Sequence, residues 1–161
     1  MKKLLSALLV LVMLLSLPGI GALAASDELT WSLDKKGTLT ISGKGEMPDY
    51  SGDTPPWVKY RDDIKAVVIE EGVTHIGAQC FQFCTKLKSV TIPSSVESIG
   101  AAAFYRCEKL SAVYYGGTAS DWNKIEIERY NKRLTSAELV IADTETSAPA
   151  PSGKPVGGKL K

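Results

Sequence analysis

One histidine and three cysteines are the side chains of this sequence best suited to nucleophilic chemistry or metal binding. His75 precedes Cys80 and Cys84 in the stretch VTHIGAQCFQFC, and Cys107 follows later. A thiolate activated by an imidazole is a nucleophile, and the same groups bind zinc. A metal site usually needs four converging ligands, and a catalytic pair needs a third group that orients its base. Because a second histidine is missing, we predict no catalytic residue, no cofactor and no metal site. A thiol enzyme or metal protein remains the last alternative.

Two pairs of neighbouring carboxylates, Asp62–Asp63 and Glu70–Glu71, are the next candidates for chemistry. Adjacent residues of a strand point to opposite faces, so neither pair can converge as an acid–base dyad. Solvated turns are the simpler interpretation of both pairs.

Residues 64–86 and 87–109 are two versions of one 23-residue unit that agree at ten aligned positions. A period of this length is typical of a solenoid. Each unit opens with apolar residues that alternate with outward ones, which predicts a strand with one buried face. The apolar strand positions are Val67, Ile69, Val90 and Ile92.

The second half of each unit predicts a turn at Gly77 or Gly100, where positive φ costs little. An alanine three residues before Phe81 or Phe104 is then typical of one short helical turn that faces inward. We therefore expect a mixed β/α solenoid, a leucine-rich-repeat coil of parallel strands and short helical turns. Phe81 should stack on Phe104.

The flanking segments predict two end caps and a tail. Residues 25–63 begin with the alternating stretch LTWSLDKKGTLTISG, which favours a β-hairpin cap followed by a loop. Residues 64–142 hold the repeats 64–86, 87–109 and an atypical third one, 110–132, together with a C-terminal cap. The residues of this cap that are expected to cover the end of the core are Trp122, Ile125, Ile127 and Leu134. Residues 143–161 are rich in Pro, Gly, Ser and Lys, which is typical of a disordered tail.

The first 24 residues have the three parts of a secretory signal peptide. Lys2 and Lys3 precede an uncharged apolar run at residues 4–17, and Ala-Leu-Ala at 22–24 supplies the small residues that a signal peptidase reads. The apolar run is shorter than the roughly 20 residues that span a bilayer. We therefore predict a secreted, extracellular protein that could associate with the cell surface and has no membrane span after cleavage.

Cleavage would remove two of the 19 basic residues and none of the 18 acidic ones. The resulting net charge of about −1 gives no electrostatic reason to bind nucleic acid.

The cysteines fit the repeat better than they fit a reactive site. Cys84 and Cys107 occupy the same repeat position, and Cys80 aligns with Ala103. Stacked positions direct their Cβ atoms in parallel, which is unfavourable for a disulfide. We expect three free, buried thiols, with a Cys84–Cys107 disulfide as the alternative.

The stretches LKSVTIPSSVESIGAAAFYRCEKL and IKAVVIEEGVTHIGAQCF resemble the BspA-type leucine-rich repeat of bacterial secreted proteins. LTWSLDKKGTLTISGKGEMPDY is similar to the usual leader of these repeats, and VYYGGTASDWNKIEI with LTSAELVI is similar to their usual ending. The resemblance implies an exported leucine-rich solenoid on or near the cell surface. It also implies adhesion or matrix binding, and it carries over no catalytic residues. Many relatives have more repeats, so this chain could be a short or truncated relative.

The outward strand positions form the expected partner-binding surface, because solenoids usually bind through such faces. These positions are Val68, Thr91, Tyr114, Ser89 and Ala112. Tyr114 is the large aromatic among them, and aromatic residues are favoured as interface anchors. We predict a non-enzymatic protein-interaction or cell-surface adhesion module whose partner is a host matrix or cell-envelope protein. A structural spacer, or a fragment of a larger surface protein, is the first alternative.

Overall fold

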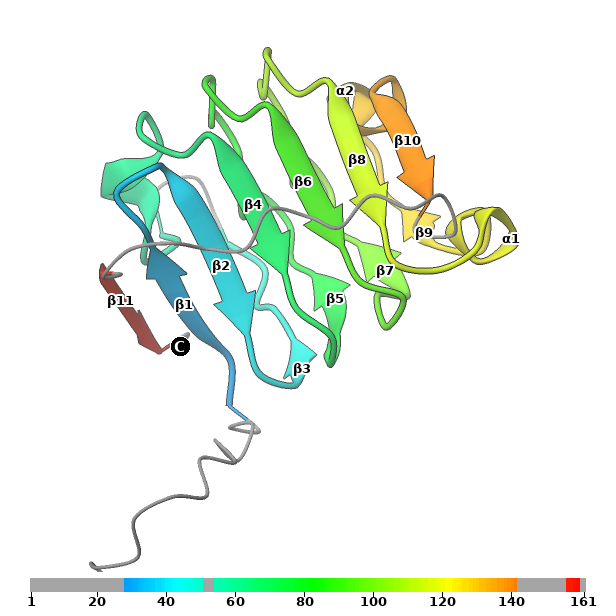
Figure 1. The fold of residues 1–161 in the computed structure, drawn as a ribbon, viewed down its shortest axis with the longest axis horizontal. Helices are drawn as coiled ribbons and strands as arrows, with labels where there is room; N and C mark the ends of the chain where they lie inside the picture. The colour runs from blue at the N-terminus through cyan, green and yellow to red at the C-terminus, as the bar shows by residue number, and fades with distance from the viewer. Residues whose placement is uncertain (1–27, 51–53, 142–155, 160–161) are drawn as a thin grey trace, which may run out of the picture.

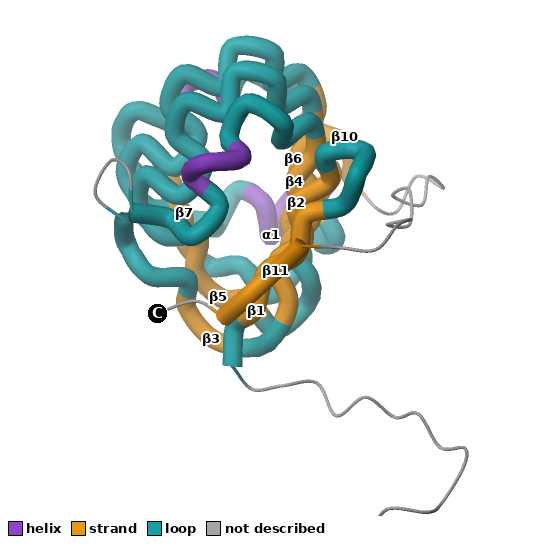
Figure 2. The backbone as a smooth tube through the Cα atoms, turned by 90° about the vertical axis from the view of Figure 1, so that its left-hand side faces the viewer, coloured by secondary structure: helices purple, strands orange, loops and turns teal. Residues whose placement is uncertain are grey.

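We describe the chain from a computed structural model, which places residues 28–50, 54–141 and 156–159 (Figure 1). The expected signal peptide, 1–24, and most of the expected tail, 143–161, lie outside these residues. The described chain winds as a coil, so that strands of successive windings lie side by side (Figure 1, Figure 2). The predicted repeat fold with parallel strands is confirmed.

The first side of the coil is a seven-stranded sheet. Its strands, in the order in which they neighbour one another, are β10 (Glu138–Ile141), β8 (Ala112–Tyr115), β6 (Ser89–Ile92), β4 (Ala66–Ile69), β2 (Thr38–Ser42), β1 (Thr30–Leu33) and β11 (Val156–Lys159). The strands from β10 to β2 are parallel, because each begins a new winding. β1 and β2 form the expected antiparallel hairpin. β11 pairs antiparallel with β1, so the expected disorder of the tail is wrong for residues 156–159.

The second side is a four-stranded parallel sheet of shorter strands. Its members are β3 (Gly45–Glu46), β5 (Val73–Ile76), β7 (Ser98–Ile99) and β9 (Glu126–Ile127). Three helical segments, each about one turn long, complete the described structure: the 3₁₀ helix η1 (Val58–Tyr60) and the α-helices α1 (Ala119–Trp122) and α2 (Lys132–Thr135).

Equivalent apolar side chains of successive windings stack in register inside the coil. Val67 pairs with Val90, and Val90 pairs with Val113. Phe81 and Phe104 are stacked, with ring centroids 5.2 Å apart. All five side chains are at most 1% exposed. Each such burial stabilises the fold by about 1.5–3 kcal/mol, so the stacked columns hold the windings together.

Residues 38–50 and 54–63 belong to a winding of their own, which goes beyond the hairpin cap and loop expected for 25–63. β2 pairs in parallel with β4, and β3 with β5. Trp57 stacks on Phe81 with ring centroids 5.6 Å apart. The indole N–H of Trp57 also donates to the carbonyl of Cys80 at 2.8 Å. Trp57 therefore takes the place that phenylalanine has in the next two windings.

The third side of the coil consists of turns, and the expected short helical turns are wrong at this place. The backbone takes positive φ twice in each repeat, at Gln79 (60°), Phe83 (62°), Ala102 (57°) and Arg106 (60°). A right-handed helix has negative φ throughout, so it cannot continue through these residues. Amides of one winding instead donate to carbonyls of the next, as Phe81 N does to Ala103 O at 2.9 Å.

Gly77 and Gly100 serve a different purpose from the one expected. Neither has the positive φ found at Gly37, Gly43, Gly45 and Gly72. A Cβ on Gly77 would lie 1.9 Å from the carbonyl oxygen of Pro48, and one on Gly100 would lie 2.5 Å from the amide nitrogen of Ala78. These glycines let the backbones of neighbouring windings approach closely.

The C-terminal end of the core is covered by the residues expected there. Ile125 and Leu134 are buried, and Trp122 and Ile127 pack against the core. Asn131 joins them, and the sequence analysis did not predict it. It is 3% exposed and accepts a hydrogen bond from the backbone N–H of Phe104 through Oδ1 at 3.0 Å. Its amide nitrogen donates to the carbonyls of Gly100 and Glu128.

Candidate functional site

The outer face of the seven-stranded sheet carries the expected binding residues in two straight rows. One row runs through Thr40, Val68, Thr91, Tyr114 and Val140, and the other through Thr38, Ala66, Ser89, Ala112 and Glu138. The five predicted residues Val68, Thr91, Tyr114, Ser89 and Ala112 are all half-buried. The structure thus brings them together on one surface, and whether they bind a partner remains a prediction.

This surface is small and almost uncharged. Glu138 is the only charged residue in the two rows. Five strands about 4.8 Å apart and four residues long give a face of about 19 Å by 13 Å. That is well below the roughly 800 Å² that each partner contributes to a stable interface. The face suits a narrow contact centred on Tyr114, and other surfaces would have to add to it.

His75 has two polar neighbours that the sequence analysis missed. Its Nδ1 is hydrogen-bonded to Ser98 Oγ at 2.7 Å, and its Nε2 lies 3.5 Å from Asp49 Oδ1. The backbone N–H of Ala78 donates to the same Asp49 oxygen, and this bond, with a smaller effect from His75, lowers the pKa of Asp49. Ser98 lies 23 residues after His75. The repeat period alone could therefore have identified it.

The serine, histidine and aspartate do not make a convincing catalytic triad. A triad joins serine to Nε2 and the carboxylate to Nδ1, whereas the two nitrogens are exchanged here. The contact to Asp49 is longer than a normal hydrogen bond, and the Asp49 side chain is 70% exposed. His75 and Ser98 are also in-register partners of β5 and β7. The set links three successive windings.

The three cysteines are free and buried, as the sequence indicated. Burial raises the pKa of Cys84 to about 12 and raises the pKa values of Cys80 and Cys107 as well. Cys107 Sγ donates to the carbonyl of Phe81 at 3.2 Å. Thiols held protonated in a dry interior are poor nucleophiles. Within the part of the chain that the structure describes, no three histidine, cysteine or carboxylate side chains converge as metal ligands.

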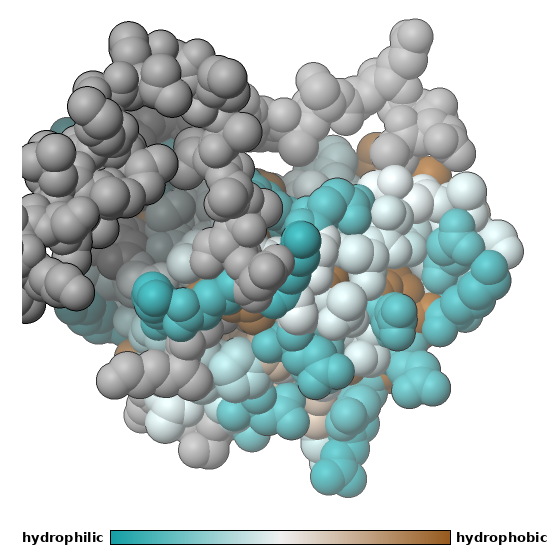
Figure 3. Space-filling view, turned by 90° about the horizontal axis from the view of Figure 1, so that it is seen from below, coloured by the Kyte–Doolittle hydropathy of each residue, from teal (hydrophilic) through white to brown (hydrophobic). Residues whose placement is uncertain are grey.

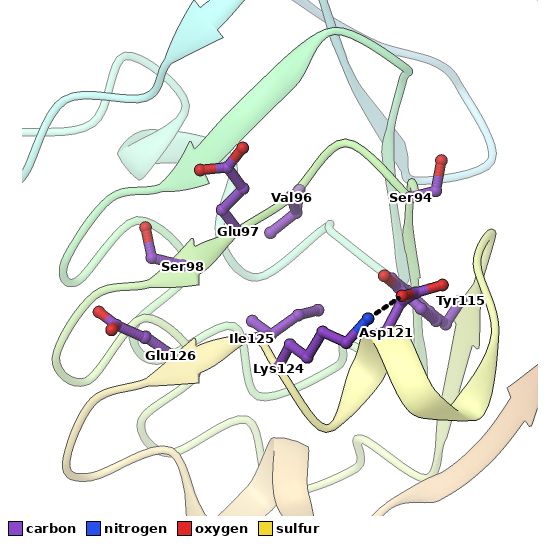
Figure 4. Close-up of a pocket in the computed structure, with 9 residues that line it drawn as sticks. All are labelled: Ser94, Val96, Glu97, Ser98, Tyr115, Asp121, Lys124, Ile125 and Glu126. Carbon is purple, nitrogen blue, oxygen red and sulfur yellow. Dashed lines mark hydrogen bonds and ion pairs between the residues drawn. The ribbon is translucent and has the colours of Figure 1, made fainter.

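A pocket of about 520 Å³ lies between the loop after β6 and the segment from α1 to β9 (Figure 4). Glu97, Ser98 and Glu126 lie on one side of it, and Ser94 and Tyr115 on the other. Among the lining residues, Lys124 Nζ donates to Asp121 Oδ1 at 2.8 Å. That bond and one from Thr118 lower the pKa of Asp121 to about 2. Lys124 and Asp121 therefore neutralise one another, and Glu97 and Glu126 also line the pocket.

One face of the described surface carries few apolar side chains. Seen from below the view of Figure 1, where β3, β5 and β7 lie, the described surface is mostly hydrophilic or neutral (Figure 3). Among the residues that the structure places, no helix has the length and apolar character needed to cross a bilayer.

Comparisons with known proteins agree with this architecture. The crystal structure of a leucine-rich repeat protein from Eubacterium ventriosum ATCC 27560, at 2.50 Å resolution, is 40% identical and superimposes with a TM-score of 0.53. The match covers 56% of the present chain and 24% of that one, so this chain spans about a quarter of the length of its structural relative. A search of curated proteins found no match.

The family comparison covers the part of the chain that forms the windings. Residues 59–139 match the family model described as the BspA type leucine-rich repeat region (6 copies). Proteins of this type are typically bacterial surface or secreted proteins, and leucine-rich repeats commonly mediate protein–protein interaction. The 23-residue windings, their parallel strands and this match together show that the chain belongs to the BspA-type leucine-rich repeat family.

Proposed function

We propose that this protein is an exported, non-enzymatic interaction module that binds a host-matrix or cell-envelope protein through the outer face of its seven-stranded sheet. The two in-register rows on that face carry the proposal. Their threonine, serine, alanine and valine side chains are short, so they have little side-chain entropy to lose on binding. Tyr114 is the aromatic anchor within it.

Among the residues that the structure describes, the side chains best suited to catalysis are poorly arranged for it, which supports a role in binding. The thiols are buried, and the serine–histidine–aspartate set has the wrong imidazole connectivity for acyl transfer. The signal-peptide pattern of residues 1–24 supports export.

The small area of the sheet face favours one competing function, a structural spacer within a larger surface assembly. A spacer needs its core and its ends, but no specific outer face. The two functions therefore differ in the effect of substitutions on Tyr114 and Thr91.

A pull-down with the purified chain separates the two functions. The chain is immobilised and exposed to host matrix or cell-envelope extract, and captured proteins are titrated for saturation. An interaction module captures one saturable partner. The double variant Tyr114→Ser/Thr91→Lys should weaken that capture at least about tenfold, since truncating a hot spot costs about 2 kcal/mol or more.

The matched control is Thr74→Lys, which adds the same charge at a half-buried residue of β5, outside the two rows. Capture by the control should equal that of the unsubstituted chain. Absence of any saturable partner, or equal loss in the control, would favour the spacer.

A further inference from the structure

Three aromatic side chains form a continuous ladder on the turn-built side of the coil. Phe83 and Tyr105 meet edge to face with ring centroids 5.9 Å apart, and Tyr105 and Tyr130 do so at 6.5 Å. The rings come from three successive windings, and the turns that carry them are stacked away from the seven-stranded sheet (Figure 2). This aromatic ladder is therefore separate from the rows around Tyr114.

Two of the three ladder rings are exposed, whereas half of the twelve aromatic residues of the chain are buried. Phe83 is 39% exposed and Tyr130 is 62% exposed, and Tyr105 between them is half-buried. Phe83, Tyr130 and Leu139 are the large hydrophobic side chains with the greatest exposure among the described residues. Two of these three lie in one ladder, and exposed apolar groups that gather in this way mark interaction sites.

Two arginines extend over the ladder. The guanidinium carbon of Arg106 lies 5.7 Å from the ring centre of Tyr105, and that of Arg129 lies 5.5 Å from the ring centre of Tyr130. Cation–π contacts of this kind hold the guanidinium groups in place. Arg106 also reaches Glu108 at 3.5 Å, but both side chains are more than half exposed, so that ion pair is weak. The guanidinium groups are therefore positioned to accept further carboxylates.

The backbone at the ladder is one that large side chains rarely adopt. Phe83, Arg106 and Tyr130 have φ of 62°, 60° and 68°. Glycine or asparagine would occupy such positions with less strain. Repeat geometry explains the φ values, but it does not explain why bulky aromatic and arginine side chains occupy the positions.

The ring geometry identifies the class of partner. The ring planes are turned by 79° and 76° at the two steps, so faces and edges alternate. A sugar chain stacks best on coplanar rings, which this ladder lacks. Tyrosine and arginine, in contrast, are the residue types enriched at the hot spots of protein interfaces. The rings recur every 5.9–6.5 Å, close to the roughly 6.6 Å between alternate side chains of an extended polypeptide.

We propose that Phe83, Tyr105 and Tyr130, together with Arg106 and Arg129, form a second docking surface for an extended acidic polypeptide segment. Apolar side chains of the segment pack against the exposed surfaces of the rings, and its carboxylates pair with the two guanidinium groups. This surface goes beyond the sheet face of the proposed function and would add the contact area that the sheet face lacks.

The test uses fluorescence anisotropy with a labelled nine-residue peptide in which Glu alternates with Leu and Tyr. A second peptide has Lys in place of every Glu, and polygalacturonate serves as an acidic carbohydrate. We expect the Glu peptide to bind at least tenfold more tightly than the Lys peptide, and more weakly as salt is raised. Polygalacturonate should not compete with it.

The ladder variants use the positive φ of Phe83 and Tyr130, which glycine tolerates better than an aromatic residue does. Phe83→Gly and Tyr130→Gly each remove a ring at a position where glycine is less strained, so the thermal midpoint should stay within a few degrees. Each should weaken peptide binding about tenfold. Arg106→Gln/Arg129→Gln should weaken binding and also reduce its salt dependence, which a merely structural role would not do.

Tyr114→Ser is the control for the other surface, and it should leave peptide affinity unchanged. The proposal is overturned if both peptides bind equally, if neither binds, or if polygalacturonate displaces the Glu peptide. It is also overturned if folded ladder variants retain full affinity. Loss of peptide binding only in Tyr114→Ser would place the peptide on the sheet face, which would overturn the second surface and support the first.

Discussion

Asn131 shows how one polar side chain can complete a repeat structure. Within the repeats, amides on the turn side donate to carbonyls of the next winding. At the last such turn the Phe104 amide donates to Asn131 Oδ1, so a side chain takes the place of the next backbone carbonyl. The same side chain donates to the Gly100 and Glu128 carbonyls, so it satisfies backbone groups that would otherwise be buried without partners.

Asn131→Ala should therefore lower the free energy of unfolding by about 1–3 kcal/mol, because it leaves buried backbone groups unpaired. Urea unfolding followed by circular dichroism measures the change. The exposed Asn123 is the control, and Asn123→Ala should cost no more than about 0.5 kcal/mol. Equal costs for the two variants would show that the buried hydrogen bonds contribute little.

The buried thiols make stability depend on pH in the alkaline range. The folded state holds the pKa of Cys84 at about 12, above its ordinary value of 9.0, because burial disfavours the thiolate. The unfolded chain therefore loses its thiol protons first as the pH rises. The stabilising contribution is fully present below pH 9 and decreases between about pH 9 and 12.

Urea midpoints at pH 7.5 and 10.5 should show this loss, and it should be smaller in Cys84→Ala, which cannot ionise. Thiol reagent added at pH 8 should modify the folded chain slowly and all three cysteines rapidly after unfolding. Fast modification of the native chain would contradict the burial of these thiols.

At the scale of elements, the windings are joined by backbone contact as much as by side chains. Gly77 and Gly100 recur at one repeat position because the preceding winding passes within contact distance of their Cα atoms. The sequence predicted glycine at a turn, and the structure shows glycine at a close approach instead. The distinction matters, because the two explanations predict different tolerance to substitution.

Gly100→Ala should destabilise the fold by about 3 kcal/mol, since its Cβ would meet the Ala78 backbone at 2.5–2.9 Å and must push the windings apart. Gly116→Ala is the matched control, because its Cβ would come no closer than 3.3 Å to any atom. The control should change stability by less than about 1 kcal/mol. Similar midpoints of thermal unfolding for both variants would contradict the close approach.

At the scale of the whole molecule, a single apolar core runs from Leu29 to Leu134 through every winding. Its two ends differ. β11 covers the outer edge of β1, while β10 forms the other edge of the seven-stranded sheet, where Leu139 is 36% exposed. The two proposed docking surfaces lie on different sides of this core, so a partner that reaches both would wrap around the coil.

The sequence by itself determined the winding. Alternation at Val67 and Ile69, repeated at Val90 and Ile92, predicts strands that stack in register, and all four residues are at most 2% exposed. The outward rows follow from the same alternation, since the side-chain period of a strand is two. The sequence could assign these repeated residues to the core or to the outer face, because the local alternation of side chains matches their contacts in the tertiary structure.

Only the tertiary structure revealed the first winding, the turn geometry and the approach of Asp49 to His75. Trp57 follows Ile41 by 16 residues, whereas Phe81 follows Ile69 by 12. Trp57 therefore completes the aromatic column in space, although it does not align with Phe81 in the repeat. Asp49 approaches His75 from another winding, and the ladder rings meet across windings. Such contacts depend on where loops of unequal length return the chain to the core. Residue type and local periodicity do not encode that position.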